Sequence, residues 1–259
     1  MKKLSAIIIT FNEERNIARC LNSLKDIADE IVVIDSGSTD ATVAICKQFN
    51  AKVIIHEFKG FIEQKNFAYL HTTGDWVLLL DADEEASETM KASIVAELKN
   101  PKHDGYSFNR LTYYCGKWIR SCGWYPDAKL RLFKRGAGEW AGQNPHDKLT
   151  LLKNKTSSYL KGDILHYSYY SFTEHIHRAN KYANIAAEIM FKKGKTISLF
   201  GIIIKTNARF IKCYILNKGI FDGIQGLMIS TISALEVFIK YSKLLLLNSK
   251  NKDEEGFYK

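Results

Sequence analysis

A short apolar segment near the end of the first third of the chain stops abruptly at two carboxylates. Residues 74–85 read GDWVLLLDADEE, in which Trp76 to Leu80 are all apolar and Asp81 and Asp83 are one residue apart. An unbroken apolar run of this length is typical of a strand that is covered on both faces in a parallel sheet. Such strands end at the edge where α/β sheets bind their ligands. The segment therefore favours an α/β fold with a binding site at Asp81.

The spacing of Asp81 and Asp83 concentrates negative charge in one place. Two carboxylates this close resist ionising together unless a cation is present. A hard divalent cation with oxygen ligands, itself bound to substrate phosphates, would neutralise them. Acidic residues after a strand can also simply form a loop and cap the next helix, and the spacing alone leaves both interpretations open.

Strand and helix patterns alternate at short spacing before this segment. The predicted strands are Leu4–Thr10, Asp29–Ile34, Lys52–Ile55 and Trp76–Leu80. The predicted helices contain Ile17, Leu21 and Leu24, then residues 41–49, then residues 60–70. This alternation predicts βαβ units and a doubly wound, mostly parallel sheet, whose strand ends would bring their polar residues to one crevice.

The pattern changes after Pro101. Strands are predicted at Tyr106–Tyr114 and Lys129–Lys134, an irregular segment at Trp140–His146, and helices at Thr173–Met190, Leu199–Leu216 and Gly223–Leu247. We expect one domain over residues 1–190, with a first half at 1–100 and a second half at 101–190. Residues 191–259 would form a basic helical tail.

Several motifs in this order resemble the donor half of family 2 glycosyltransferases, which have the GT-A fold. They are IIITFNEERNI, VVIDSGSTDAT, the segment Gln64-Lys65-Asn66, and LLLDADEE. Downstream, WYPD at 124–127, LRLF at 130–133 and HDKL at 146–149 resemble the lipopolysaccharide inner-core beta-glucosyltransferase subgroup. The resemblance covers nearly the whole chain and implies a nucleotide-diphospho-sugar transferase with a C-terminal helical extension. Residues 1–190 would then be the catalytic domain, with a nucleotide-sugar half at 1–100 and an acceptor half at 101–190.

The resemblance also implies roles for the matching residues. Nucleotide-sugar binding would fall to Thr10, Phe11, Asn12, Glu13, Asp35, Lys65, Asp81 and Ala82. Asp35 would accept a hydrogen bond from uracil, and Ser38 and Asp40 would hold their loop in shape. Lys65 would reach the diphosphate, although a solvated helix lysine is the alternative. Asp83 would ligate Mg²⁺ or Mn²⁺ bridging the two phosphates.

Inverting transfer needs a base to activate the acceptor hydroxyl. Asp147 stands where the subgroup usually carries Glu, one methylene longer; Asp127 is the second candidate and Glu139 the third. His146 is a candidate metal ligand or phosphate contact, and a packed histidine is the alternative; His166 is a weaker candidate. Arg131 is expected to pair with a carboxylate or a phosphate, since its planar fork suits both.

Charge is unevenly distributed along the chain. Lys and Arg total 37 against 28 Asp and Glu, and residues 191–259 hold 12 of the basic and 5 of the acidic residues. Residues 223–235 are uncharged but too few to cross a bilayer, which needs about 20. The pattern favours helices lying on an anionic membrane surface, with packing on the catalytic domain as the alternative. Nucleic acid is not expected as a partner.

The other totals suit a cytoplasmic protein. Five scattered cysteines without C-x-x-C spacing indicate reduced thiols, and the N-terminal apolar run is interpreted as a core strand rather than a signal peptide. The expected function is metal-dependent, inverting transfer of a hexose from a UDP-sugar, most simply UDP-glucose, to an inner-core heptose. The expected location is the inner face of the cytoplasmic membrane. Rival interpretations are the same chemistry on polyprenyl phosphate or a capsule or exopolysaccharide precursor, and a catalytically dead GT-A scaffold.

Overall fold

Two compact units make up the chain in the computed structural model, which describes residues 3–143 and 146–256. The side chains of residues 143, 146, 147 and 250–256 lie outside this description. The first unit comprises residues 1–111 and 126–167, and the second comprises residues 112–125 and 168–259. The division falls within two long strands, so it differs from the predicted boundary at residue 190.

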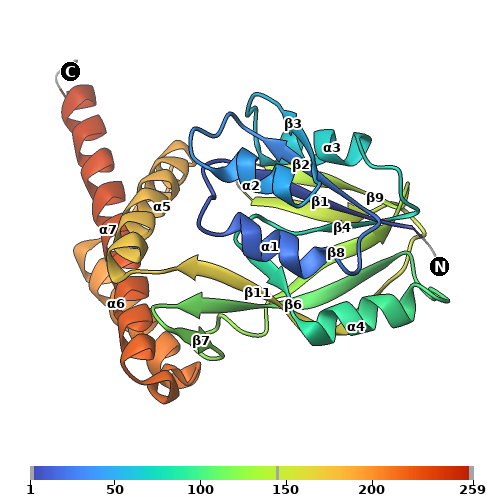
Figure 1. The fold of residues 1–259 in the computed structure, drawn as a ribbon. Coiled ribbons are helices and arrows are strands. Elements are labelled where there is room, and N and C mark those ends of the chain that lie inside the picture. The colour runs from blue at the N-terminus through green and yellow to red at the C-terminus, as the bar shows by residue number, and fades with distance from the viewer. Residues whose placement is uncertain (1–2, 144–145, 257–259) are drawn as a thin grey trace. The chain divides into compact units, whose positions relative to one another are not determined.

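Four parallel strands open the first unit, in the order β3-β2-β1-β4 (Figure 1). They are β1 (Leu4–Thr10), β2 (Glu30–Asp35), β3 (Lys52–Ile55) and β4 (Trp76–Leu79). The helices that follow are α1 (Ile17–Leu24), α2 (Thr42–Gln48), α3 (Phe61–Leu70) and α4 (Glu88–Glu97). This half matches the sequence prediction because its apolar runs are unbroken and its helices are periodic.

The second half of the sheet alternates antiparallel strands with strands that run parallel to the first four, so the sheet is mostly parallel, as predicted. Beyond β4 the order continues β8-β6-β11-β5, in which β8 is antiparallel to β4 and β6, and β5 is antiparallel to β11. These strands are β8 (Ala128–Lys134), β6 (Gly105–Tyr114), β11 (Ser157–Tyr169) and β5 (Glu84–Ala86). β6 and β11 run in the same direction, because hydrogen bonds join their starts (Gly105 N–H to the Thr156 carbonyl) and their ends (Cys115 N–H to the Tyr169 carbonyl). β6 and β8 were predicted, whereas β5 and β11 were not. The segment predicted to be irregular instead forms a hairpin of β9 (Gly138–Gln143) and β10 (His146–Leu151).

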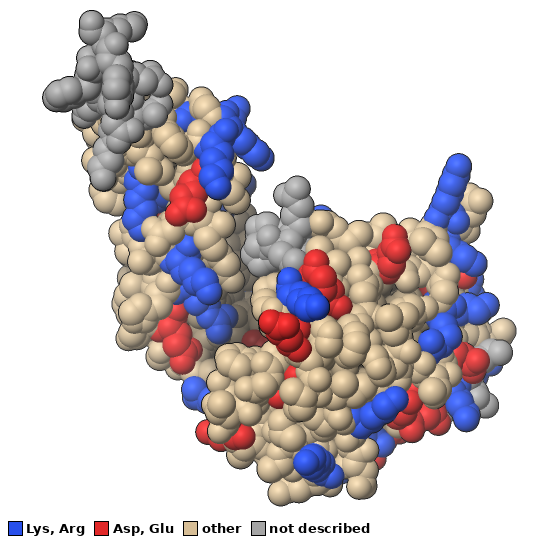
Figure 2. Space-filling view, turned by 90° about the horizontal axis from the view of Figure 1, so that it is seen from above, with Lys and Arg blue, Asp and Glu red and all other residues tan. Residues whose placement is uncertain are grey.

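The sheet is covered on both faces. On one face, α1, α2 and α4 pack on strand residues such as Leu4, Ile8 and Leu78. On the other, α3 and the β9–β10 hairpin pack on residues such as Ile7, Ile34 and Phe133. Alternate strand residues therefore enter opposite cores, which explains why the parallel strands are apolar throughout. Figure 2 shows basic side chains interspersed with acidic ones on the face that it presents.

The second unit is mainly helical. Its elements are β7 (Lys117–Ile119), α5 (Phe172–Lys192), α6 (Leu199–Ile211), a π-helical turn η1 (Lys212–Leu216), a 3₁₀ turn η2 (Gly219–Asp222) and α7 (Gly223–Gly256). Both α5 and α6 pack against α7 (Figure 1). The predicted helix at Leu199–Leu216 changes to π geometry at Lys212, and α7 continues past its predicted end at Leu247.

Candidate active site

The carboxyl ends of β1, β2 and β4 meet at one edge of the sheet, as predicted. Thr10 is in register with Asp35, and Leu79 with Ile7. The loops after β1 and β2 are tied together, because the Asn12 backbone N–H donates to the Ser38 hydroxyl at 2.8 Å. The Asn12 side-chain oxygen in turn accepts from the Thr39 N–H at 2.9 Å. These bonds fix Asn12 in the left-handed region, at φ 54°.

Asp35 organises the second of these loops. Its carboxylate is fully buried and accepts from the backbone N–H groups of Gly37 (3.0 Å) and Ser38 (2.8 Å) and from the Ser38 hydroxyl. A carboxylate has about four lone-pair sites, so one further donor can still bind. Gln64 on α3 supports the same loop by donating to the Ser36 hydroxyl at 3.0 Å and to the His56 carbonyl at 3.1 Å.

Thr10 and Phe11 lie beside the loop that follows β2, and one side chain is buried while the other is exposed. Thr10 is buried, and its hydroxyl has no hydrogen-bond partner among the described residues. Phe11 is 56% exposed. Glu13 is held by residues at the starts of α2 and α1, since its N–H donates to the Thr42 hydroxyl at 2.8 Å and its carboxylate accepts from Asn16 at 2.7 Å. An unsatisfied buried hydroxyl next to an exposed aromatic ring is suited to a polar, planar ligand.

Asp81 lies between two buried cations. Lys65 places its Nζ 3.3 Å from one carboxylate oxygen, and Arg131 places its Nη2 3.0 Å from the other. Burial alone would raise the pKa of Asp81, but Arg131 and Lys65 outweigh it and hold this pKa well below its usual range. Lys65 is therefore not a solvated helix lysine, and the predicted pairing of Arg131 with a carboxylate is confirmed.

Glu84 shares Arg131 with Asp81 and was not predicted as a site residue. Its carboxylate is fully buried, accepts from Arg131 Nη2 at 2.7 Å and lies 3.9 Å from the Arg110 guanidinium. Burial raises the pKa of Glu84, and the charge of Asp81 adds to the increase. The guanidinium thus neutralises two carboxylates that would otherwise repel each other.

Asp83 has a different environment and pairs with His166. Asp83 Oδ2 lies 3.3 Å from His166 Nε2, and the Asp83 carbonyl accepts from the Tyr167 N–H at 2.9 Å. His166 reaches this position because β11 pairs with β5, which sets His166 opposite Glu84. The His166 Nδ1 atom is buried without a partner in the described part of the chain. Ala82 is buried between the two aspartates.

The candidate bases fall partly outside the described residues. The backbone of His146 and Asp147 lies in β10, in register with Gln143 and Gly142, but neither side chain is described. Asp127 is described, and its carboxylate accepts from Arg110 Nε at 3.0 Å and pairs with Lys129 at 2.9 Å. Arg110 therefore links Asp127 to Glu84. Glu139 is exposed on β9.

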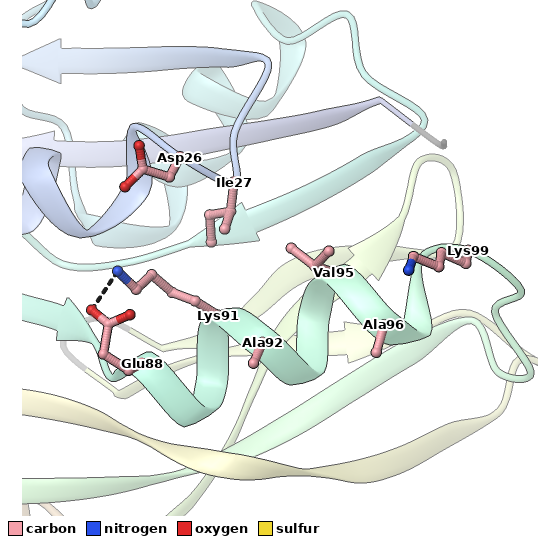
Figure 3. Close-up of a pocket in the computed structure, with 8 residues that line it drawn as sticks. All are labelled: Asp26, Ile27, Glu88, Lys91, Ala92, Val95, Ala96 and Lys99. Carbon is pink, nitrogen blue, oxygen red and sulfur yellow. Dashed lines mark ion pairs between the residues drawn. The ribbon is translucent and has the colours of Figure 1, made fainter.

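A separate hollow lies away from these residues. Figure 3 shows it between the end of α1 and α4, with Lys91 pointing to Glu88. Its volume is about 430 Å³. It is lined by Asp26, Ile27, Glu88, Lys91, Ala92, Val95, Ala96 and Lys99. Asp26 and Ile27 precede β2, so the hollow lies toward the amino end of that strand and is not part of the candidate active site.

Comparison with known proteins places this geometry in a family. The family model described as "Glycosyl transferase family 2" matches residues 5–149, more than half of the chain. The chain belongs to glycosyltransferase family 2. With its parallel strands continued by the antiparallel β8, this glycosyltransferase has the GT-A fold.

Relatives of this family 2 glycosyltransferase match it nearly end to end. An uncharacterized glycosyltransferase of Rickettsia typhi is 34% identical over 98% of this chain and 90% of the relative. The lipopolysaccharide core biosynthesis glycosyltransferase LpsC of Rhizobium meliloti is 27% identical over 93% of this chain and 91% of its own. Among solved structures, glucosyl-3-phosphoglycerate synthase from Mycobacterium tuberculosis, in complex with Mn²⁺ and UDP-glucose, matches over 44% of each chain. Its identity is 23% and its TM-score 0.36.

Proposed function

We propose that this glycosyltransferase transfers a hexose from a UDP-sugar, specifically glucose from UDP-glucose, to a heptose of the lipopolysaccharide inner core, with inversion. The observation that carries the proposal is the Asp83–His166 pair beside the Lys65–Asp81–Arg131 cluster at the carboxyl edge of the sheet. The near end-to-end similarity to LpsC, which is named for lipopolysaccharide core biosynthesis, supports this acceptor.

The nucleotide would lie over the ends of β1 and β2. Phe11 offers an exposed ring for the uracil, and the buried Asp35 carboxylate would accept its N–H. The unpartnered Thr10 hydroxyl, Asn12 and Glu13 complete the wall of this pocket. A site built to hydrogen-bond one base leaves buried polar groups unpaired with another, which penalises the wrong nucleotide.

The residues present fit a divalent cation shared with the donor. Asp83 contributes a carboxylate and His166 an imidazole nitrogen, whereas Asp81 is already engaged by two cations. The described residues hold no cluster of three or more His, Cys, Asp or Glu side chains suited to a metal ion. Diphosphate oxygens and water would therefore complete the coordination, as is usual for Mg²⁺. Bound there, Mg²⁺ or Mn²⁺ would neutralise charge on the departing nucleoside diphosphate.

Lys65 and Arg131 hold positive charge beside Asp81, at the carboxyl edge of the sheet. Lys65 is only 5% exposed and Arg131 only 6%. Because buried charges interact more strongly than solvated ones, Lys65 would stabilise the diphosphate as it leaves. Arg131 would hold Asp81 and Glu84 in position.

The acceptor hydroxyl needs a base on the opposite side of the sugar from the leaving group. We assign this role to Asp147, with Asp127 as the second candidate. The Asp127 oxygens already accept from Arg110 and Lys129, so this carboxylate is engaged within the protein. The base would take the proton of the heptose hydroxyl as that oxygen attacks the anomeric carbon.

The test is transfer of radiolabelled sugar from UDP-glucose to heptose-containing core lipid, with Mg²⁺, with Mn²⁺ and with EDTA. Unlabelled UDP-glucose, UDP-galactose and UDP-N-acetylglucosamine serve as competitors. Metal-dependent incorporation suppressed only by UDP-glucose is the expected result. Incorporation only into polyprenyl phosphate or a capsule precursor would overturn the acceptor. Failure of every acceptor together with failure to bind UDP would identify a catalytically dead scaffold.

A further inference from the structure

Helix α6 exposes its apolar side chains instead of burying them. Of its 13 residues, Ile202 is buried. Phe200 is 72% exposed, Ile203 58% and Ile204 50%. Large contiguous apolar patches are uncommon on the surfaces of soluble monomers and mark interaction sites.

The exposed apolar residues of α6 follow helical spacing. Phe200, Ile204 and Ile211 are separated by four and seven residues, which places them on one face. Lys205, Arg209 and Lys212 recur at the same kind of spacing on a different face, and all three are exposed. The helix therefore has two apolar sides. One side, at Ile202, packs inside the helical unit, and the other is the exposed stripe of Phe200, Ile204 and Ile211.

The exposed apolar surface continues through the next turns of the chain. We call the whole set the apolar surface; it comprises Leu199, Phe200, Ile203, Ile204, Ile211, Ile215, Leu216, Ile220, Phe221 and Ile224. The turns η1 and η2 pack on each other, η1 packs on α6, and both turns pack on α7, so these residues come from neighbouring elements. Phe221 is 79% exposed and Leu216 69%.

The charges around the apolar surface have one sign. Residues 199–227 contain Lys205, Arg209, Lys212 and Lys218, all exposed, and a single acidic residue, Asp222. Asp222 is buried and neutralised, because it pairs with Lys117 at 3.0 Å and accepts from the Ser121 hydroxyl. The exposed charge of this segment is therefore positive.

We propose that the apolar surface docks into the headgroup region of an anionic lipid bilayer. An amphipathic helix with large apolar and basic side chains lies in that region with its apolar residues about 5–10 Å deep, while its Lys and Arg contact anionic headgroups. An isologous pairing of two copies would bring the four basic residues of each toward those of the other, and like charges oppose such an interface.

Docking on the surface is favoured over crossing the bilayer. Among the described residues, one helix, Gly219–Ser249, is long and apolar enough to span a membrane, with a mean hydropathy of 1.3. Within it, Ile229, Ile232 and Leu244 are buried inside the helical unit, and Glu236 interrupts the apolar sequence. These residues are already used for packing, whereas those of the apolar surface are exposed.

The experiment is co-sedimentation of the full chain with vesicles of phosphatidylcholine alone or with 30 mol% phosphatidylglycerol, roughly the fraction at which surface potential matters. The expected result is binding to the anionic vesicles that weakens as salt rises. The double substitution Phe200→Asp and Phe221→Asp should weaken binding by roughly tenfold or more. Replacing Lys205, Arg209 and Lys212 with Gln should remove most of the salt dependence.

A matched control is Leu70→Asp, which changes a leucine that is 74% exposed in the other unit. It should bind vesicles like the unchanged protein, and circular dichroism should show all variants folded. Equal binding to neutral vesicles, or no loss in the Phe variant, would overturn the proposal. So would a dimer in analytical ultracentrifugation that the Phe variant dissociates. Vesicle binding needs no sugar donor, so this proposal and the proposed function can fail separately.

Discussion

Individual charged side chains at the sheet edge divide into two kinds. Asp81 and Glu84 are neutralised within the protein by Arg131 and Lys65. Asp83 instead has His166, whose charge depends on protonation. Asp81 and Glu84 are thus compensated by cations of the protein itself. Asp83 and His166 form a pair that we propose binds the cation shared with the donor. The two aspartates of one short motif therefore have separate tasks.

Substitution of Asp83 or His166 should remove cation binding and leave the fold intact. We expect Asp83→Asn and His166→Gln each to lower sugar transfer by roughly 10²-fold or more, because the donor diphosphate loses its shared cation. Isothermal titration should show Mn²⁺ binding strengthened by UDP in the unchanged protein and not in either variant. Asp26→Asn, in the hollow next to α4, is the control; transfer unaffected by Asp83→Asn would refute the assignment.

Arg131 should matter for stability more than a surface ion pair does. In Arg131→Met the fully buried Glu84 keeps the Asp81 backbone N–H at 3.0 Å but loses its close cation, since Arg110 lies 3.9 Å away. We therefore expect a loss of about 3–5 kcal/mol in the free energy of unfolding. Adding Glu84→Gln to Arg131→Met should recover much of the lost free energy of unfolding, because no unpaired carboxylate remains buried. Lys129→Met, at a half-exposed pair, should cost less than about 1 kcal/mol. Urea unfolding measures all three, and equal losses would contradict this account.

At the level of secondary-structure elements, the sequence predicted the first half of the sheet well, including the meeting of its strand ends at one edge. Unbroken runs such as Val77–Leu80 and periodic residues such as Ile17 and Leu21 are strong local signals. The second half lacks them: β11 mixes polar and apolar residues around Gly162, and β10 follows a Gly-bearing segment. His166 was consequently underestimated, because its meeting with Asp83 depends on that unpredicted strand. Arg131 within LRLF did give a signal, since a charge inside an apolar strand needs a partner.

Packing of β11 against α4 depends on Gly162. Its φ is +105°, and a Cβ there would lie 2.2 Å from the Met90 backbone nitrogen. Backbone cannot move aside as a flexible side chain can, so Gly162→Ala should destabilise the fold by roughly 3–5 kcal/mol. Gly136→Ala has a similar positive φ but open space, and should cost only about 1 kcal/mol. Thermal unfolding distinguishes the two variants by their Tm. Equal decreases in Tm would show that β11 and α4 can move apart to admit the new Cβ, contrary to this prediction.

At the scale of the whole molecule, each compact unit has its own core, and a histidine in the core of the helical unit makes its stability depend on pH. The helical unit buries His175 among Tyr114, Trp124 and Tyr169, with His175 Nδ1 3.0 Å from the Tyr114 hydroxyl. Burial lowers the pKa of His175 from its ordinary 6.5 to about 4, and Arg178 adds to the effect. The folded unit therefore holds this imidazole neutral where an unfolded chain would protonate it.

The sign of the resulting pH dependence follows from that difference. Above pH 6.5 both states hold neutral His175, and its contribution to stability is complete. Between pH 6.5 and about 4 only the unfolded state takes up the proton, so stability falls by about 1.4 kcal/mol per pH unit from this residue. In His175→Phe we expect a shallower decline over that window, because other groups still titrate but this one is gone. Urea unfolding followed by tryptophan fluorescence at pH 7, 6 and 5 gives both slopes. Parallel slopes would show that His175 is protonated in the folded unit, which its enclosure by three aromatic rings and its proximity to Arg178 both oppose.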